Sequence, residues 1–194
     1  MKISTERLRI REIELADAGN IARYAGNIKV SRYLLVVPHP YNMKDAKWWI
    51  RKCKKDAMEK PRKNYELSIT LKAEPEAGMI GSIGLTKVDL YKGTGTIGYW
   101  LGEPYWRQGI MNEAAKALID FAFKRLKLRR LDVSAAGVND ASNGLIEKLG
   151  FVYEGTRRKR TRVKSTGKIY DERIYGMLRE EWAKKLCCMI KREP

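Results

Sequence analysis

The loop between an apolar segment and a helical pattern holds the residues best suited to bind an anion. The segment 95–101 is followed by the loop 102–108, and Gly109 then opens an amphipathic helical pattern. The first turn of a helix leaves backbone N–H groups unpaired, and the helix dipole adds positive potential there. Arg107 adds a charge, and Gly109 has no Cβ to obstruct a ligand. This spacing predicts a phosphate site, and an ordinary strand–loop–helix junction is the alternative.

Residues 106–114 (Trp-Arg-Gln-Gly-Ile-Met-Asn-Glu-Ala) resemble the acyl-CoA pyrophosphate loop of GNAT-superfamily N-acetyltransferases. They lack the three-glycine and the glycine-lysine-serine/threonine fingerprints of other phosphate loops. The general GNAT pattern has glutamine or arginine where this chain has Trp106, and glycine or alanine where it has Met111. The pattern formed here by Tyr105-Trp106, Gly109 and Glu113-Ala114 is similar to that of one GNAT branch, the RimJ/RimL-type ribosomal-protein N-terminal acetyltransferases.

A second group of polar residues marks a predicted helix from Asn139 to Leu149. From the residues alone, Asn139 or Asp140 caps the helix, and capping by itself explains the group. The group is also similar to the GNAT segment after the fifth strand, where the asparagine and serine face the pantetheine arm and the sulfur. Many members place a tyrosine general acid where this chain has Ile146. The branch resemblance therefore assigns Ser142 to donate a hydrogen bond to the sulfur.

The resemblance extends over nearly the whole chain. Residues 5–11 resemble the opening of the RimJ/RimL branch, and residues 167–171 and 175–182 resemble its closing hairpin. It implies the α/β (α+β) GNAT fold, with a central mixed, mostly antiparallel sheet, helices on both faces, and a splay at the cofactor site. The implied cofactor is acetyl-CoA, and the implied catalytic residues are Ser142 and Asn139. The implied cofactor-binding residues are Trp100, Leu101, Arg107, Gln108, Gly109, Ile110, Met111, Asn112, Asn139, Ser142 and Lys148.

The acceptor amine must be neutral before it attacks a thioester. A lysine amine with a pKa near ~10.4 must lose roughly 4 kcal/mol of protonation preference at about pH 7.5, whereas an α-amine with a pKa near ~8 loses under about 1 kcal/mol. GNAT members often carry a base in the fourth strand, where this chain has Thr96. Glu66 and Glu103 are substitutes by sequence proximity, and each is more readily explained as a solvated surface carboxylate. We therefore expect an α-amine acceptor.

The predicted reaction is direct attack in a ternary complex on a ribosomal-protein-like N-terminus, with a backbone N–H near Leu101 facing the oxyanion. Two other functions remain open. The same fold acetylates small amines such as polyamines, amino acids and antibiotics, and a basic RNA- or ribosome-binding protein needs no catalysis. The net charge of +17 favours anionic partners and makes an acidic polyamine pocket less expected. The basic run Arg157–Lys168 is predicted to be a solvated strand, with docking to RNA or an acidic protein as its alternative.

Length and composition limit the classes of protein to which the chain can belong. The length of 194 residues suits a single domain, 1–194, and no apolar run reaches membrane-spanning length. The three cysteines, Cys53, Cys187 and Cys188, have no zinc-type spacing with histidine, so we expect reduced thiols, no metal and a cytoplasmic location. We expect a monomer or homodimer. The single glutamine among many lysines and glutamates is typical of a thermophile.

The elements that must position these residues follow from the hydrophobic periodicity. Predicted strands cover 8–11 (at a sheet edge), 65–71, 79–88, 96–101, 130–136, 151–163 and 168–178. Predicted helices cover 15–24, 28–34, 42–60, 109–123, 139–149 and a last segment from about 179. Leu15 is expected on the buried face of the first helix, and Asn42 is expected to cap the third. This alternation predicts three layers, with helices around a sheet.

Overall fold

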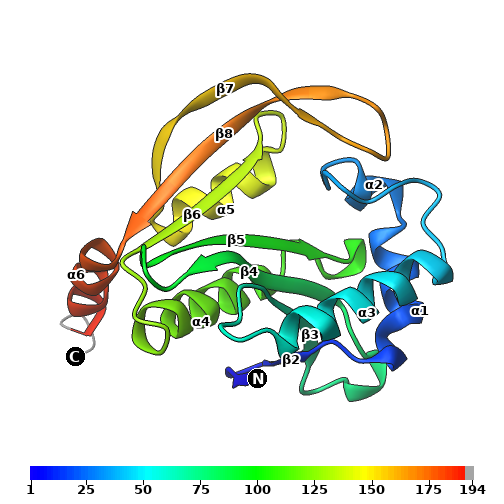
Figure 1. Cartoon of the computed structure of the whole chain (residues 1–194), viewed down its shortest axis with the longest axis horizontal. Helices are drawn as coiled ribbons and strands as arrows, with labels where there is room; N and C mark the ends of the chain where they lie inside the picture. Colours follow the sequence, from blue (N-terminus) through cyan, green and yellow to red (C-terminus); the bar gives the residue numbers. More distant parts are fainter. Residues whose placement is uncertain (191–194) are drawn as a thin grey trace.

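The computed structural model describes residues 1–190, with side chains as far as Lys184. Its centre is an eight-stranded sheet with the strand order β1-β2-β3-β4-β5-β6-β8-β7 (Figure 1). The strands are β1 (Lys2–Ser4), β2 (Leu8–Glu12), β3 (Tyr65–Leu71), β4 (Gly81–Asp89), β5 (Thr94–Leu101), β6 (Arg130–Ala136), β7 (Val152–Arg162) and β8 (Ile169–Leu178). The helices are α1 (Ala18–Ala25), α2 (Ile28–Ser31), α3 (Met43–Met58), α4 (Ile110–Lys124), α5 (Asp140–Leu149) and α6 (Arg179–Ile190).

Helices lie on both faces of the sheet, although only the face towards α4 is mainly apolar; β3 and β4 direct residues such as Glu66, Ser68 and Ser82 to the other face. On one face, Leu67, Ile97 and Leu131 pack with the buried side of α4 in the main core. On the other face, a smaller cluster joins α1 to α3 through residues such as Ile21 and Ile50. The fold is therefore three layers around a mixed sheet, as the sequence predicted.

The sheet splits between β5 and β6, its one parallel pair. Their pairing runs from Thr94, opposite Arg130, to Ile97, opposite Val133, and goes no further. Beyond that point β5 stays paired with β4 as far as Leu101, and β6 stays paired with β8. The two halves of the sheet therefore diverge after Ile97, and Figure 1 shows β5 and β6 separating. Residues 98–101 keep one edge of their backbone without a strand partner.

Most predicted elements are confirmed, and the local signals explain why. Asn42 caps α3 with its side chain accepting from Lys44 N and Asp45 N, and Asp45 completes the capping box. Gly150 ends α5 in a left-handed conformation with φ 98°. Two predictions about exposure are wrong. β2 is not an edge strand, because β1 pairs outside it, and Leu15 is 54% exposed rather than buried.

Candidate functional site

The start of α4 has the backbone geometry of an anion site. Gly109 precedes the helix in a left-handed conformation, with φ 74° and ψ 0°. Arg107 has a φ of 60°, which is uncommon for a residue with a Cβ. Ile110 and Met111 bury their side chains in the core, so only their N–H groups are available at the first turn. The turn therefore offers backbone donors, with Arg107 exposed beside them.

A second arginine from the other end of the chain supports this turn. Glu113, in the first turn of α4, accepts hydrogen bonds from Thr5 Oγ1 (2.5 Å), Arg7 N (2.9 Å) and Arg7 Nε (2.7 Å). Arg7 Nη1 also donates to Gln108 O at 3.0 Å. A Cβ placed on Gly109 would lie 3.5 Å from Arg7 Nη2. Sequence reasoning missed Arg7, because only the fold brings it beside Gly109.

The loop that leads to α4 is fixed from within. Trp106 Nε1 donates to Leu101 O at 2.8 Å, and Gln108 Nε2 donates to Pro104 O at 2.9 Å. The side chain of Gln108 is therefore engaged by the loop itself, while its backbone O accepts from Arg7 Nη1. The turn formed by residues 102–109 is therefore held by hydrogen bonds within the loop and by the one from Arg7.

Glu103, one of the two candidate bases, ties this loop to α2. Its carboxylate accepts from Lys29 Nζ at 2.5 Å and from Asn27 Nδ2 at 2.7 Å. The hydrogen bonds from Lys29 and then Asn27 lower the pKa of Glu103. A carboxylate with a lowered pKa is a weaker proton acceptor, so Glu103 is better suited to holding the loop than to acting as a base.

A groove of about 480 Å³ runs along α4 towards the end of α5. It brings together two residues that the sequence assigned to the cofactor, Asn112 and Lys148, and adds Lys116. Asn112 Oδ1 is buried and has no hydrogen-bond partner among the described residues. Trp182 forms one wall and donates its Nε1 proton to Asp120 Oδ1 at 2.9 Å. The groove is thus lined by two cationic side chains, Lys116 and Lys148, and by the carboxylates of Glu113, Asp120 and Glu181.

Ser142 lies at the split in the sheet, in contact with a tyrosine. Its Oγ is 2.8 Å from the hydroxyl of Tyr99, which lies on β5 just beyond the last residue paired with β6. Burial raises the pKa of Tyr99 to about 12, and the hydrogen bond with Ser142 opposes that rise. Asn139 Oδ1 accepts from Ser142 N at 3.3 Å, which is the capping role open to it from sequence. The pair Tyr99–Ser142 places two neutral hydroxyls at the split.

Trp100 and Leu101 do not share one side of the sheet. Leu101 belongs to the main core, with α4, whereas Trp100 packs against the cluster of α1 and α3. Alternation along β5 requires this, because neighbouring strand residues face opposite ways. Leu101 can therefore adjoin a ligand only through its backbone, and its O already accepts from Trp106.

Glu66, the other candidate base, lies on β3 opposite Gly84 of β4. Burial raises the pKa of this carboxyl to about 7, Lys52 of α3 opposes the rise, and Asp56 adds to it. Glu66 is therefore half-buried, rather than the fully solvated surface carboxylate that the sequence led us to expect. The cause is the packing of α3 across this part of β3, which the sequence does not reveal.

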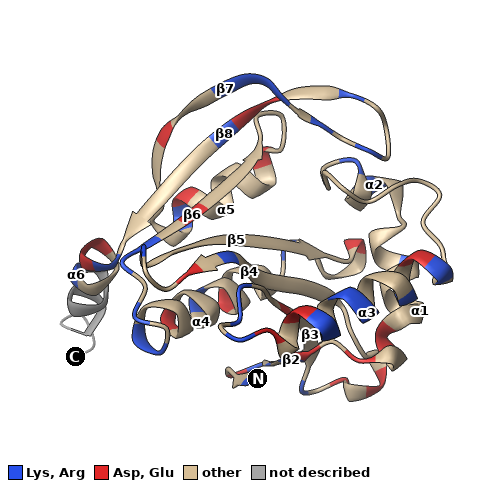
Figure 2. Cartoon of the chain, viewed as in Figure 1, with Lys and Arg blue, Asp and Glu red and all other residues tan. Residues whose placement is uncertain are grey.

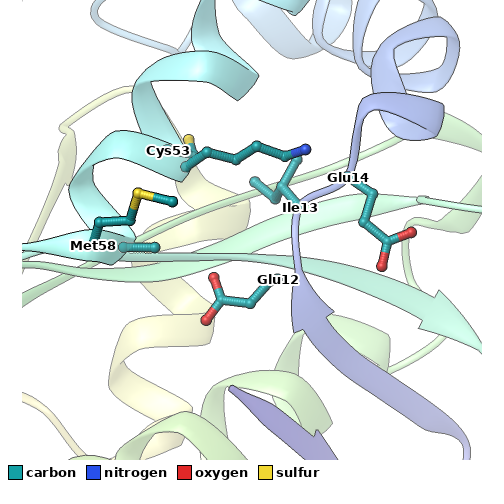
Figure 3. A pocket seen from close by; sticks show the side chains of 7 residues that line it. Glu12, Ile13, Glu14, Cys53 and Met58 are labelled. Carbon is teal, nitrogen blue, oxygen red and sulfur yellow. The ribbon is translucent and has the colours of Figure 1, made fainter.

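A further cavity lies between the β2–α1 turn and α3 and has a volume of about 280 Å³ (Figure 3). Its lining is mainly apolar, and the carboxylates of Glu12 and Glu14 flank Ile13 in the view. Burial raises the pKa of Cys53 to about 12, so this thiol is neutral and a poor nucleophile. The side chains of Cys187 and Cys188 lie outside those described.

Metal-binding side-chain clusters and membrane-spanning helices are both absent from the described part of the chain. No group of three histidine, cysteine, aspartate or glutamate side chains there can hold a metal ion. Within residues 1–190, no helix combines the length and the apolar character needed to cross a membrane.

Comparisons with known proteins agree with this geometry. The family described as Acetyltransferase (GNAT) domain matches residues 7–152. An uncharacterized N-acetyltransferase, p20 of Bacillus licheniformis, is 31% identical over 179 residues, which cover 92% of this chain and 97% of that protein. The ribosomal-protein-serine acetyltransferase of Escherichia coli is 35% identical over 80 residues, which cover 41% of this chain and 45% of that protein.

A solved structure shows the same fold. RimL, a ribosomal L7/L12 α-N-protein acetyltransferase in complex with coenzyme A, superposes with a TM-score of 0.79 at 19% identity, covering 92% of this chain and 98% of that one. A glycine-led helix start, a split sheet and a hydroxyl pair at the split occur together on this fold, and the domain match spans most of the chain. The chain belongs to the GNAT acetyltransferase family, in its RimJ/RimL-like branch, and is an acetyltransferase that uses acetyl-CoA.

Proposed function

We propose that this enzyme transfers an acetyl group to a protein N-terminal α-amine, by direct attack in a ternary complex. The observation that carries the proposal is the presence of three features in one fold. The start of α4 offers anion donors, the split after Ile97 opens the sheet, and Tyr99–Ser142 places hydroxyls beside the split. Acetyl-CoA supplies an activated acyl group as a thioester and a sulfur leaving group.

The residues around α4 fit the charged end of the cofactor. The N–H groups at Gly109, Ile110 and Met111 would bind the diphosphate, with the guanidinium groups of Arg107 and Arg7 beside it. The groove with Asn112, Lys116 and Lys148 would hold the adenosine and its phosphate.

The residues at the split fit the acyl end. The unpaired edge of β5 at residues 98–101 would hydrogen-bond the extended pantetheine arm, as an added strand would. The Ser142 hydroxyl would donate a hydrogen bond to the sulfur as the C–S bond breaks, and Asn139 would fix Ser142 by capping α5. The developing oxyanion would meet a backbone N–H near Leu101.

The acceptor proposal rests on proton chemistry and on the bridge over the split. Thr96 stands where many relatives have a base, and an α-amine needs less help with deprotonation than a lysine side chain. The tip of the β7–β8 hairpin is joined to the end of α2 by Ser165 Oγ, which donates to Ser31 O (2.9 Å), and to the segment after α2 by Lys164 N, which donates to Leu35 O (3.2 Å). Figure 1 shows the hairpin reaching across to α2. An acceptor entering beneath this bridge would be thin, as a chain terminus is.

Two of the proteins compared above favour a ribosomal protein as acceptor, since one is a ribosomal-protein-serine acetyltransferase and the other a ribosomal L7/L12 α-N-protein acetyltransferase. Lysine and arginine colour much of β7 in Figure 2, and its side chains are largely exposed. Docking of an acidic protein or RNA on the basic segment Arg157–Lys168 is part of the proposal. A cytoplasmic location and a monomeric or homodimeric state also remain predictions.

The proposal is tested by offering the enzyme acetyl-CoA and matched peptides. One set has a free N-terminus and no lysine, a second has a blocked N-terminus and one lysine, and a third contains polyamines and amino acids. We expect a mass increase of one acetyl group in the first set, at a rate at least about 10-fold above the second at neutral pH, because the α-amine is more often neutral. Faster acetylation of the lysine or small-amine set would contradict the proposal.

A further inference from the structure

Glu66 is a half-buried carboxylate on β3, a central strand of the sheet. It lies on the face of the sheet opposite α4 and α5, because Leu67, its neighbour, belongs to the core with α4. Among the described residues, no donor makes a hydrogen bond or ion pair with its carboxylate. Partial burial of a carboxylate without such a partner costs free energy. Such a group is retained more readily for chemistry than for stability.

The positions paired across from Glu66 on the next two strands, β4 and β5, are both glycines and have no side chains. Glu66 pairs with Gly84 of β4, and Gly84 pairs with Gly98 of β5. A Cβ on Gly84 would lie 2.7 Å from Glu66 Oε2, so the carboxylate extends over Gly84 towards β5. A Cβ on Gly98 would have no neighbour within 4 Å, so the space above this residue is open.

This open track leads to the point where the sheet splits. Gly98 directly follows Ile97, the last residue of β5 that is paired with β6. Adjacent strands are about 4.8 Å apart, so the carboxylate above β4 lies roughly one strand spacing from the start of the split. It reaches this place from the face opposite Tyr99–Ser142, the hydroxyls proposed for the sulfur end. An amine in the split would therefore have the hydroxyls on one side and Glu66 on the other.

We propose that the Glu66 carboxylate is the general base that takes a proton from the acceptor ammonium group. This inference rests on the proposed amine acetylation and adds a residue to it. The ammonium loses its first proton to Glu66, which later releases it to water. The nitrogen lone pair then forms the C–N bond to the acetyl carbon while the C–S bond breaks. The second N–H proton leaves with the sulfur, so an amide and a thiol result.

The charged groups around Glu66 keep it ready to accept a proton at neutral pH. From α3 it faces Lys52 and Asp56, which form an ion pair of 2.6 Å with each other, and the neutral thiol of Cys53. From β2, Arg11 lies opposite Ser68 on the same face, and both of its Nη atoms donate to Asp17 at 2.8 Å. Because these cations are already paired, burial dominates and raises the pKa of Glu66 to about 7. A base of this strength suits an α-amine with a pKa near ~8.

The test compares Glu66→Gln with the wild type, using Glu76→Gln in an exposed loop as the matched control. At saturating acetyl-CoA and acceptor, we expect kcat of Glu66→Gln to fall about 100-fold at about pH 7 and about 10-fold at about pH 9. The loss is smaller at the higher pH because hydroxide in the solvent then removes the ammonium proton in place of Glu66. The acidic limb of kcat should move from near pH 7 in the wild type towards the pKa of the amine. A kcat ratio that does not change with pH would overturn the inference.

A second measurement does not involve turnover. The folded protein holds a proton on Glu66 between its usual pKa of 4.5 and its raised pKa of about 7, so the ionised carboxylate destabilises the fold above that range. Without ligand, Glu66→Gln should therefore raise the melting temperature over the wild type above about pH 7, with the gain shrinking towards about pH 4.5. Glu76→Gln should show no such trend. A pH-independent difference would contradict the buried carboxylate on which the inference depends.

The two failures are distinguishable. If the wild type acetylates peptides and Glu66→Gln matches it at every pH, the base assignment is wrong and the proposed function stands. If the wild type acetylates no amine, the proposed function fails and the base assignment fails with it.

Discussion

Replacing Gly109 by valine is expected to lower the affinity for coenzyme A by at least about 100-fold, which is about 2.7 kcal/mol. Gly109 has a φ of 74°, where a β-branched residue is strained, and it immediately precedes the amides of Ile110 and Met111. A valine would also bring a Cβ to 3.5 Å from Arg7 Nη2 and would fill the space proposed for the diphosphate. Each lost charge-assisted hydrogen bond is worth about 1.5–3 kcal/mol, so loss of two is sufficient. Isothermal titration with coenzyme A measures the change.

Gly167→Val is the matched control for this variant. Gly167 has a similar φ of 67°, and a Cβ there would have no neighbour within 4 Å. Both substitutions introduce similar backbone strain, of about 1–3 kcal/mol in unfolding free energy. We expect Gly167→Val to keep wild-type affinity for coenzyme A. Equal affinity losses in both variants would show that strain, rather than occupation of the phosphate site, causes the effect.

Ser142→Ala is expected to lower kcat by about 100-fold while the dissociation constant for coenzyme A changes less than about threefold. The hydroxyl acts only when charge develops on the sulfur, so its loss affects the transition state more than the ground state. The helix cap should persist, because Asn139 accepts from the backbone N of residue 142 and not from the side chain. Steady-state kinetics together with titration separate the two effects.

Tyr99 should act through Ser142. The two hydroxyls are 2.8 Å apart, and we expect the phenol, as the stronger acid, to donate to Ser142 Oγ and leave the serine proton for the sulfur. Tyr99→Phe should therefore lower kcat by about 10-fold, and the double variant should be no slower than Ser142→Ala alone. Tyr153→Phe, which removes an exposed hydroxyl bonded to Thr156, serves as the control and should keep wild-type kcat. Additive losses would instead indicate that the two hydroxyls act independently.

Local signals in the sequence were sufficient for most of the secondary structure. The capping residues Asn42 and Asn139, the terminal Gly150 and the changes of hydrophobic period depend on neighbours in the chain, so they predict element ends well. Strand β1 was missed because three residues are too short for alternation to appear. It is held by pairing with β2, which a local reading does not reveal.

The residues brought to the site by long-range contacts were harder to identify. Arg7 reaches Gly109 only because β2 lies beside α4, about a hundred positions away in the chain. Glu66 carries no local sign of burial, since α3 and the pairing of Gly84 with Gly98 together create its surroundings. Tyr99 was missed for a similar reason: the split in the sheet and the start of α5 place its hydroxyl on Ser142.

The central claim is that the amides at the start of α4 bind the diphosphate of the cofactor. A crystal structure of the protein with coenzyme A tests it most directly. We predict diphosphate oxygens within about 3 Å of the backbone nitrogens at Gly109, Ile110 and Met111, with the adenosine in the groove beside Lys116 and Lys148. A diphosphate bound elsewhere on the protein, or no coenzyme A bound at all, would contradict the account.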